Sequence, residues 1–245
     1  MTGARMIPTH GMVLAAGLGL RMRPLTDTLP KPLIPVAGRC MLDRALDQLT
    51  AAGVARRVVN THYLGHKVAE HLQARRQAAG SEAEIALSHE PDLLDTGGGV
   101  VKALPLLGSA PFFVINGDIL WRDGTEPALR RLAAAWNDDE MDALLLVHPR
   151  DSAIGYDGPG DFELASDGVL TRRANPTAPF VFTGVQILHP RLLAGSPPGA
   201  FSLNKLYDRA AATGRLHGIV HTGQWFHIGT PDGLRLAEER LRALT

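Results

Sequence analysis

The sequence MVLAAGLGLRMRPLTDTLPKPLIPV, residues 12–36, decides how the rest of the chain can be interpreted. Its apolar start, residues 12–16, has the length of a buried strand. Gly17 and Gly19 follow, and they allow positive φ and a close approach of backbone N–H groups to a ligand. Three cations come next on a turn-rich loop: Arg21, Arg23 and Lys31. A strand that ends in such a loop is suited to bind a group with several phosphates.

Two well-known phosphate-binding patterns do not fit this stretch. The dinucleotide pattern G-x-G-x-x-G fails because Met22 stands where the third glycine should be. The P-loop pattern fails because no Gly-Lys-Ser/Thr follows. The loop therefore indicates phosphate binding of another kind, unless the arginines are only solvated on a flexible turn.

A longer piece of the same region, VLAAGLGLRMRPLTDTLPKPLIPVAG at 13–38, resembles a known signature. It is similar to the sugar-1-phosphate nucleotidyltransferase pattern L-A-G/A-G-x-G-x-R-M/L-x-P-L-T followed by P-K-P/A-L/M. The later segments LDTGGG, INGDIL, FTGVQILHP and WFHIGTP fit the same family in the same order. Within the family, the chain most resembles the short bacterial type that includes N-acetylmuramate-1-phosphate uridylyltransferase. The mannose-1-phosphate guanylyltransferases share most of these motifs.

The order of the expected elements favours an α/β fold. Helical patterns at 41–52 and 62–79 alternate with strand patterns at 58–61 and 83–89, which predicts a parallel sheet with crossover helices. Residues 149–188 carry short alternating strands rich in Gly, Pro and Asp. We therefore expect a doubly wound, mostly parallel sheet with an inserted β-rich part. The resemblance implies the Rossmann-like nucleotidyltransferase fold.

We expect one domain over residues 1–245. The resemblance divides it into a nucleotide-binding half at about 11–148, a sugar-binding half at about 149–228 and a C-terminal helix at 231–244.

Composition narrows the possible partners. The 245 residues have a formal net charge of zero, which gives no electrostatic reason to expect nucleic acid or an anionic membrane. A single cysteine, Cys40, excludes an intrachain disulfide. The N-terminal residues show no secretory h-region, and no apolar run reaches the ~18 residues of a membrane span. We expect a cytoplasmic protein with a loose N-terminal extension, and the sequence does not indicate an oligomeric state.

The segment LDTGGG predicts a second backbone-rich turn, followed by a helix from Val100. One interpretation is a slot in which Thr96, Gly97 and Gly98 contact a flat base, because a larger side chain would block the ring. The alternative is a glycine-rich helix start that needs close packing. The family resemblance implies the base pocket, although Asp95 stands where the uridylyltransferases are expected to have Glu.

A buried strand at 111–115 ends in Asn116-Gly117-Asp118. Ligands collect at the carboxyl ends of parallel strands, and a carboxylate there can hold a hard cation. Asp118 is therefore a candidate ligand for Mg²⁺, although an Asp in a tight turn is also common.

The resemblance implies a role for each matching residue. The catalytic residues are Arg21, Lys31 and Asp118. The nucleotide-binding residues are Leu14, Ala15, Ala16, Gly17, Gly19, Arg21, Thr96, Gly97, Gly98 and Asn116. The sugar-binding residues are Gly160, Asp161, Thr183 and Gly184. Asp118 is the metal ligand, and His227 is a second candidate because it stands where many family members have Asp.

The implied reaction joins a nucleoside triphosphate and a sugar-1-phosphate into a nucleotide sugar and pyrophosphate. The sugar phosphate is the nucleophile, so the enzyme needs only to position the substrates and stabilise charge, with Mg²⁺ as cofactor. The subgroup resemblance favours UTP and N-acetylmuramate-1-phosphate, a reaction of cell-wall recycling. The alternatives are GTP with mannose-1-phosphate, and a regulator that binds a nucleotide sugar without turnover, which the imidazole of His227 would suit.

Overall fold

The computed structural model describes residues 7–79 and 84–243. The predicted start of the third strand at residue 83 and most of the predicted N-terminal extension lie outside these residues. The helices are α1 (Met41–Ala51), α2 (Gly65–Ala79), α3 (Asp95–Leu107), α4 (Ala128–Ala135), α5 (Asn204–Ala212) and α6 (Pro231–Arg242). The strands are β1 (His10–Leu14), β2 (Pro35–Val36), β3 (Arg39–Cys40), β4 (Arg56–Thr61), β5 (Ile85–His89), β6 (Phe112–Asn116), β7 (Ile119–Arg122), β8 (Ala143–Pro149), β9 (Phe162–Leu164), β10 (Leu170–Arg172), β11 (Phe180–Leu188), β12 (Leu216–Val220) and β13 (Gln224–His227).

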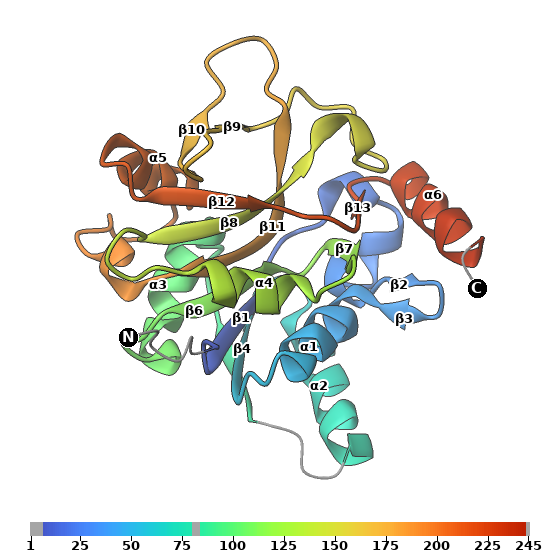
Figure 1. Cartoon of the computed structure of the whole chain (residues 1–245). Helices are drawn as coiled ribbons and strands as arrows, with labels where there is room; N and C mark the ends of the chain where they lie inside the picture. The colour runs from blue at the N-terminus through green and yellow to red at the C-terminus, as the bar shows by residue number, and fades with distance from the viewer. Residues whose placement is uncertain (1–6, 80–83, 244–245) are drawn as a thin grey trace.

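A mixed nine-stranded sheet forms the centre of the molecule (Figure 1). Its main path runs β10-β9-β11-β6-β1-β4-β5, and β8 and β12 extend from β11. The neighbours β6, β1, β4 and β5 are parallel, as the alternating helices and strands predicted. β11 is antiparallel to β6 and to β8. The β-rich segment therefore enters the central sheet itself, and the predicted fold class is confirmed.

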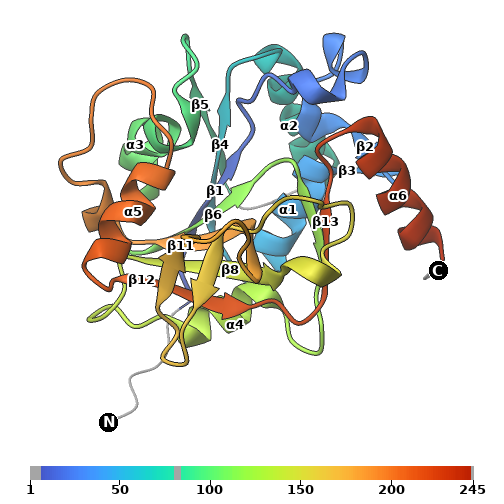
Figure 2. The same ribbon diagram turned by 90° about the horizontal axis from the view of Figure 1, so that it is seen from above.

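The strands bury alternate residues on the two faces of the sheet, which explains their continuous apolar sequences. On β6, Phe113 and Ile115 join the core cluster of α1, α2 and α4, whereas Phe112 and Val114 join the cluster of α3 and α5. Figure 2 shows α3 and α5 on one side of the sheet and α1 and α2 on the other. Helices thus cover both faces, as in a doubly wound fold.

Two predicted helix starts were wrong. α3 begins at Asp95 and not at Val100, so the three glycines lie inside its first turns. Glycine is a weak helix former, but contacts with residues 199–201 hold these turns in place. α2 begins at Gly65 and not at His62, because the chain turns first and Leu64 takes a φ of 50°.

The last helix completes a third, smaller core. Ala237 of α6 packs with Phe226 of β13 and with the buried Met22. Thr230 caps α6, since its hydroxyl accepts a hydrogen bond from the Gly233 N–H at 3.2 Å. Because Met22 belongs to the loop after β1, this core supports that loop. None of the described helices is both long and apolar enough to cross a bilayer.

Candidate active site

The carboxyl ends of β1 and β6 form the floor of the site. The two strands are parallel neighbours, with Leu14 opposite Asn116. The Gly117 N–H donates to the Leu14 carbonyl at 2.8 Å, and a Cβ on Gly117 would lie 2.6 Å from that oxygen. Glycine is therefore required where the two strands separate. Asp118 follows directly, beside the loop that leaves β1.

That loop, residues 15–36, is called the phosphate loop below. It contains three 3₁₀ turns: Leu20–Met22, Leu25–Asp27 and Lys31–Leu33. Gly19 has a φ of 65°, and its Cβ would lie 2.8 Å from the Thr26 side chain. The Thr26 hydroxyl donates to the Gly19 carbonyl at 2.8 Å, and Met22 is fully buried. Contacts within the loop and the packing of Met22 against Phe226 and Ala237 therefore fix the shape of the loop.

The phosphate loop presents free backbone donors to a cavity of about 670 Å³, called the main cavity below. Within the described part of the chain, the N–H groups of residues 16–21 have no hydrogen-bond partner. Of the predicted nucleotide-binding residues, Leu14, Ala16, Gly17, Gly19, Arg21, Thr96 and Asn116 line this cavity. Unpaired N–H groups on a loop at a strand end are suited to bind phosphate oxygens.

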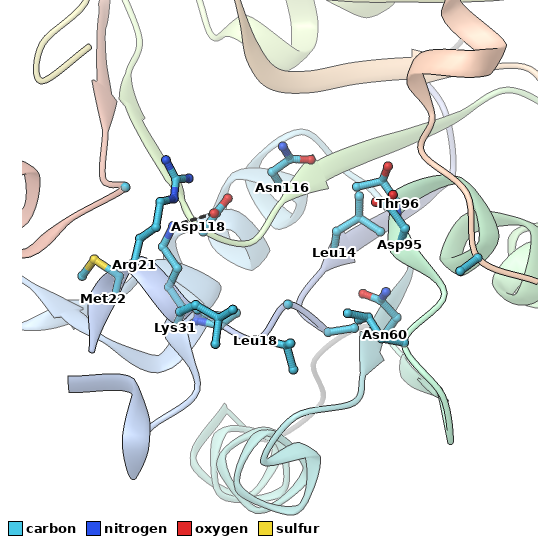
Figure 3. A pocket seen from close by; sticks show the side chains of 18 residues that line it. Leu14, Leu18, Arg21, Met22, Lys31, Asn60, Asp95, Thr96, Asn116 and Asp118 are labelled. Atoms are coloured by element: carbon cyan, nitrogen blue, oxygen red, sulfur yellow. Dashed lines mark hydrogen bonds and ion pairs between the residues drawn. The ribbon is translucent and has the colours of Figure 1, made fainter. Parts of the chain in front are cut away.

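The three predicted catalytic side chains meet at one end of the main cavity. Lys31 Nζ donates to Asp118 Oδ2 at 2.7 Å, and the Lys31 side chain is only 9% exposed. The Arg21 side chain is exposed, and its guanidinium makes no hydrogen bond or ion pair with a described residue. Figure 3 shows Arg21 and Lys31 extending toward Asp118. Two cations and one carboxylate are thus placed where a triphosphate on the loop would reach.

The opposite end of the main cavity is formed by the start of α3. Asp95 and Thr96 line it, but Gly97 and Gly98 do not. The N–H groups of both glycines donate to the Phe201 carbonyl, at 2.8 and 3.2 Å. A Cβ on Gly97 would lie 2.3 Å from the Phe201 ring. These contacts fit the close-packing alternative, and they leave neither N–H free to contact a base edge.

Asn60 and Glu90 connect the two ends of the main cavity, and the sequence analysis missed both. Asn60 Oδ1 accepts from the Ala15 N–H at 2.7 Å, and its Nδ2 donates to Glu90 Oε1 at 2.6 Å. The fully buried Glu90 also accepts from the Leu94 N–H at 3.0 Å. Ala15 is buried and does not line the cavity, so it supports the loop from behind. The available signal was a polar residue at the end of each apolar strand.

A second hollow of about 250 Å³, the inner pocket, contains most of the predicted sugar-binding residues. Lys31 and Asp118 line both the main cavity and the inner pocket. Asp161, Thr183 and Gly184 line the inner pocket but not the main cavity. Asp161 Oδ2 accepts from the Phe182 N–H at 2.8 Å, which fixes the carboxylate. The main cavity and the inner pocket therefore meet at the Lys31–Asp118 pair.

Two predicted sugar contacts are buried, and their polar groups are used inside the protein. Thr183 lines the inner pocket, but its hydroxyl donates to the Leu146 carbonyl at 2.7 Å inside the core. Gly160 lines none of the hollows described here, and its N–H donates to the Tyr156 hydroxyl at 3.1 Å. Gly160 therefore positions the neighbouring chain and does not itself reach a ligand.

A third hollow of about 260 Å³, the side pocket, opens next to the first two. Asn116 lines all three hollows, and Asp161 and Phe182 line both the inner and the side pocket. The side pocket also contains Arg172 of β10. The sequence analysis identified neither Phe182, which begins the FTGVQILHP segment but carries no polar group, nor Arg172, which lies outside the quoted motifs.

Asp118 and His227 line the same inner pocket, as the two candidate metal ligands should. His227 pairs with Ile119 across β13 and β7, which brings it next to Asp118 in the sheet. The Tyr156 ring packs edge-on against the imidazole, with 5.7 Å between centroids. Burial lowers the pKa of His227, and the positive charges of Lys31 and Arg21 lower it further. The imidazole is therefore neutral at pH 7.

Another group of metal-type donors, Cys40, Asp43 and His71, lies between α1 and α2. Asp43 Oδ1 is bonded to His71 Nε2 at 3.0 Å and accepts from Arg75 Nη1 at 2.9 Å. Burial raises the pKa of Cys40 to about 12, so its thiol stays protonated. These contacts describe an ion pair between two helices and not a metal centre.

Known proteins resemble this chain over nearly its whole length. Residues 10–157 match the family described as nucleotidyl transferase. An N-acetylmuramate alpha-1-phosphate uridylyltransferase from Caulobacter vibrioides is 44% identical, over 96% of this chain and 97% of the relative. The protein of the same description from Neisseria meningitidis serogroup B is 33% identical, over 93% and 96%.

More distant matches share the fold. A mannose-1-phosphate guanylyltransferase catalytic subunit beta from Danio rerio is 27% identical, over 95% of this chain but 68% of the relative. A solved UDP-glucose pyrophosphorylase in complex with UDP-glucose superposes with a TM-score of 0.79. It is 18% identical, and the match covers 98% of this chain and 100% of that one.

Proposed function

Since this chain belongs to the nucleotidyl transferase family, we propose that it transfers a uridylyl group from UTP to N-acetylmuramate-1-phosphate and releases pyrophosphate. The observation that carries the choice of substrates is the 44% identity to a relative of that activity, which continues from end to end of both chains. The guanylyltransferase match is weaker and leaves about a third of the relative uncovered.

The chemistry proposed is a direct displacement. An oxygen of the sugar phosphate attacks the α-phosphorus of UTP, the bond to the β-phosphate oxygen breaks, and pyrophosphate leaves. The triphosphate would lie along the phosphate loop, where the N–H groups of residues 16–21 are free to donate. Arg21 would neutralise the charge that develops on the leaving group. Lys31 would hold the α-phosphate or the sugar phosphate, because it lines both the main cavity and the inner pocket.

The donor set is compatible with a divalent cation, and we propose Mg²⁺. Asp118 uses Oδ2 for Lys31, and its side chain is 40% exposed, so the second carboxylate oxygen can serve as a ligand. Mg²⁺ is commonly bound by one or two carboxylates together with substrate phosphates. When bound, the ion supplies further neutralisation of the phosphate oxygens. Asp118 would hold it, and His227 would contribute more weakly because neutral nitrogen is a poor ligand for a hard cation.

A matrix of pyrophosphate-release assays tests the proposal. UTP and GTP are each combined with N-acetylmuramate-1-phosphate and with mannose-1-phosphate, with and without Mg²⁺. The proposal predicts the highest kcat/KM for UTP with N-acetylmuramate-1-phosphate, and loss of turnover when the metal is chelated. Higher kcat/KM for GTP with mannose-1-phosphate would establish the rival activity. Binding of nucleotide sugar without any pyrophosphate release would establish the regulator.

A further inference from the structure

The side pocket contains a cation that the proposed reaction does not yet use. Among its lining residues, Arg172 is the one with a positive charge, and Asp161 is the one with a negative charge. Asp161 also lines the inner pocket, together with Lys31 and Asp118. A sugar phosphate held at Lys31 would therefore extend its ring toward Asp161, and substituents on the ring would reach the side pocket.

Arg172 is held in a fixed position. Its Nε donates to Asp208 Oδ1 of α5 at 2.7 Å, and its Nη2 donates weakly to the Asn204 carbonyl at 3.4 Å. The guanidinium carbon lies 5.0 Å from the centroid of the Phe162 ring. Three contacts from two elements, α5 and β9, thus fix the side chain, whose exposed fraction is 33%. A cation that is already ordered loses little entropy when it binds a ligand.

The same contacts leave one edge of the guanidinium available. Nε and Nη2 face Asp208 and Asn204, whereas Nη1 has no hydrogen-bond partner among the residues that the structure describes. The edge formed by Nη1 and the second proton of Nη2 can receive a carboxylate with two parallel hydrogen bonds. The side pocket is thus suited to an anionic group that is planar and has two oxygens.

Asp161 adds selectivity to this arrangement. Its Oδ2 accepts from the Phe182 N–H at 2.8 Å, so the carboxylate is held in a fixed orientation. It can accept further hydrogen bonds from sugar hydroxyl or amide donors, but it repels an acidic substituent. An acid on the sugar ring is therefore directed away from Asp161 and toward Arg172.

We infer that Arg172 binds the lactyl carboxylate of the acceptor sugar, an inference that rests on the proposed function. N-acetylmuramate differs from N-acetylglucosamine by a lactyl ether at O3, and this ether carries the only carboxylate of the sugar. Arg172 would then distinguish the two acceptors, whereas the phosphate loop would not distinguish them.

The test compares two acceptors on several variants. We measure kcat/KM for N-acetylmuramate-1-phosphate and N-acetylglucosamine-1-phosphate at saturating UTP, on the wild type and on Arg172→Ala, Arg172→Lys and Arg173→Ala. Arg173 is a matched control, because it is exposed, lines none of the three hollows and donates to the Asn175 and Pro176 carbonyls. The melting temperature of each variant shows whether it folds.

Arg172→Ala should lower kcat/KM for the muramate acceptor roughly ten- to hundredfold, the range for a hydrogen-bonded charge pair. Most of the preference over the glucosamine acceptor should disappear with it. Arg172→Lys should fall between wild type and Arg172→Ala, because it keeps the charge but loses the two-bond geometry. Arg173→Ala should match the wild type. An equal loss for both acceptors, or no loss, would overturn the inference and leave Arg172 as a structural residue.

A second measurement does not depend on any variant. The wild type is assayed with the lactamide of N-acetylmuramate-1-phosphate, which has the same shape but no carboxylate charge. The inference predicts a decrease of the same size as for Arg172→Ala, whereas equal use of acid and amide contradicts it. The two proposals fail separately. A wild type that prefers GTP or mannose-1-phosphate refutes the proposed function, and a wild type that prefers the muramate acceptor without help from Arg172 refutes only this inference.

Discussion

The phosphate loop and the sugar wall are built in different ways. The phosphate loop takes part of its shape from neighbours in sequence, such as the Gly19 carbonyl, which accepts from the Thr26 hydroxyl at 2.8 Å. Arg21 projects from the loop without a hydrogen-bond or ion-pair partner among the described residues. The sugar wall, formed by Asp161, Arg172 and residues 181–184, is held by distant elements. Thr183, for example, bonds to Leu146 of β8. The free N–H groups and the exposed Arg21 of the phosphate loop therefore come from one short segment, whereas the residues of the sugar wall are held by bonds between distant elements.

The largest expected effect is on the phosphate side. Asp118→Asn should lower kcat roughly 10³-fold, because it removes the carboxylate proposed to hold the metal and also leaves Lys31 without its ion-pair partner. The measurement is the initial rate as a function of Mg²⁺ concentration, with Asp92→Asn, an exposed residue outside the three hollows, as the control. Wild-type Mg²⁺ dependence in Asp118→Asn would show that the metal is held elsewhere.

Arg21→Ala should lower kcat about 10²-fold with either acceptor sugar, because it removes one donor to the transition state. The melting temperature should stay at the wild-type value, since the side chain is exposed and makes no hydrogen bond or ion pair with a residue that the structure describes. Arg23→Ala is the matched control. Arg23 lies two residues away, pairs with Asp27 at 3.2 Å and does not line the cavity. Unchanged turnover in a folded Arg21→Ala enzyme would exclude this role.

A change in the sugar wall should instead reduce stability. Thr183→Val leaves the Leu146 carbonyl without its donor in the core, which should lower the free energy of unfolding by about 1–3 kcal/mol. Urea unfolding measures the difference. Thr171→Val, on an exposed position of β10, should change the free energy by no more than ~0.5 kcal/mol. Equal stability of the two variants would remove the proposed contrast between loop and wall.

The smallest expected effect is at His227, on the boundary between the two regions. His227→Asp should lower the Mg²⁺ concentration for half-maximal rate a few-fold, because a carboxylate oxygen suits a hard cation better than imidazole. A lower affinity for UTP would show instead that His227 contacts a phosphate. If neither the Mg²⁺ midpoint nor the UTP affinity changes, His227 has no role in the site.

The contrast between the phosphate loop and the sugar wall also explains which parts of the site could be predicted from the sequence. The apolar strand, the glycines and the cations of the phosphate loop are adjacent in the chain, so their spacing alone indicates a phosphate site. Asp118 follows a strand tip, and the general behaviour of parallel sheets places it at the ligand edge. The meeting of Lys31 with Asp118 in the structure agrees with both expectations.

Other parts of the site depend on contacts that no local pattern contains. The bond between Asn60 and Glu90 forms because β4 and β5 are neighbours in the sheet, and the two residues are 30 positions apart. The helical start of α3 depends on Phe201, whose carbonyl and ring occupy the space beside Gly97. Local propensity predicted a turn at the three glycines, but tertiary packing stabilises a helix at this position. Arg172 was missed for the same reason, since its partner Asp208 belongs to another element.

A competition assay tests the central claim most directly. The enzyme is given equal concentrations of UTP, GTP, N-acetylmuramate-1-phosphate and mannose-1-phosphate with Mg²⁺, and the nucleotide sugars formed at early times are separated by liquid chromatography and identified by mass. Their ratio reports the relative kcat/KM values in one tube. The account predicts that UDP-N-acetylmuramate is the main product, with one pyrophosphate released for each molecule formed. A mixture dominated by GDP-mannose, or one without any nucleotide sugar, would contradict it.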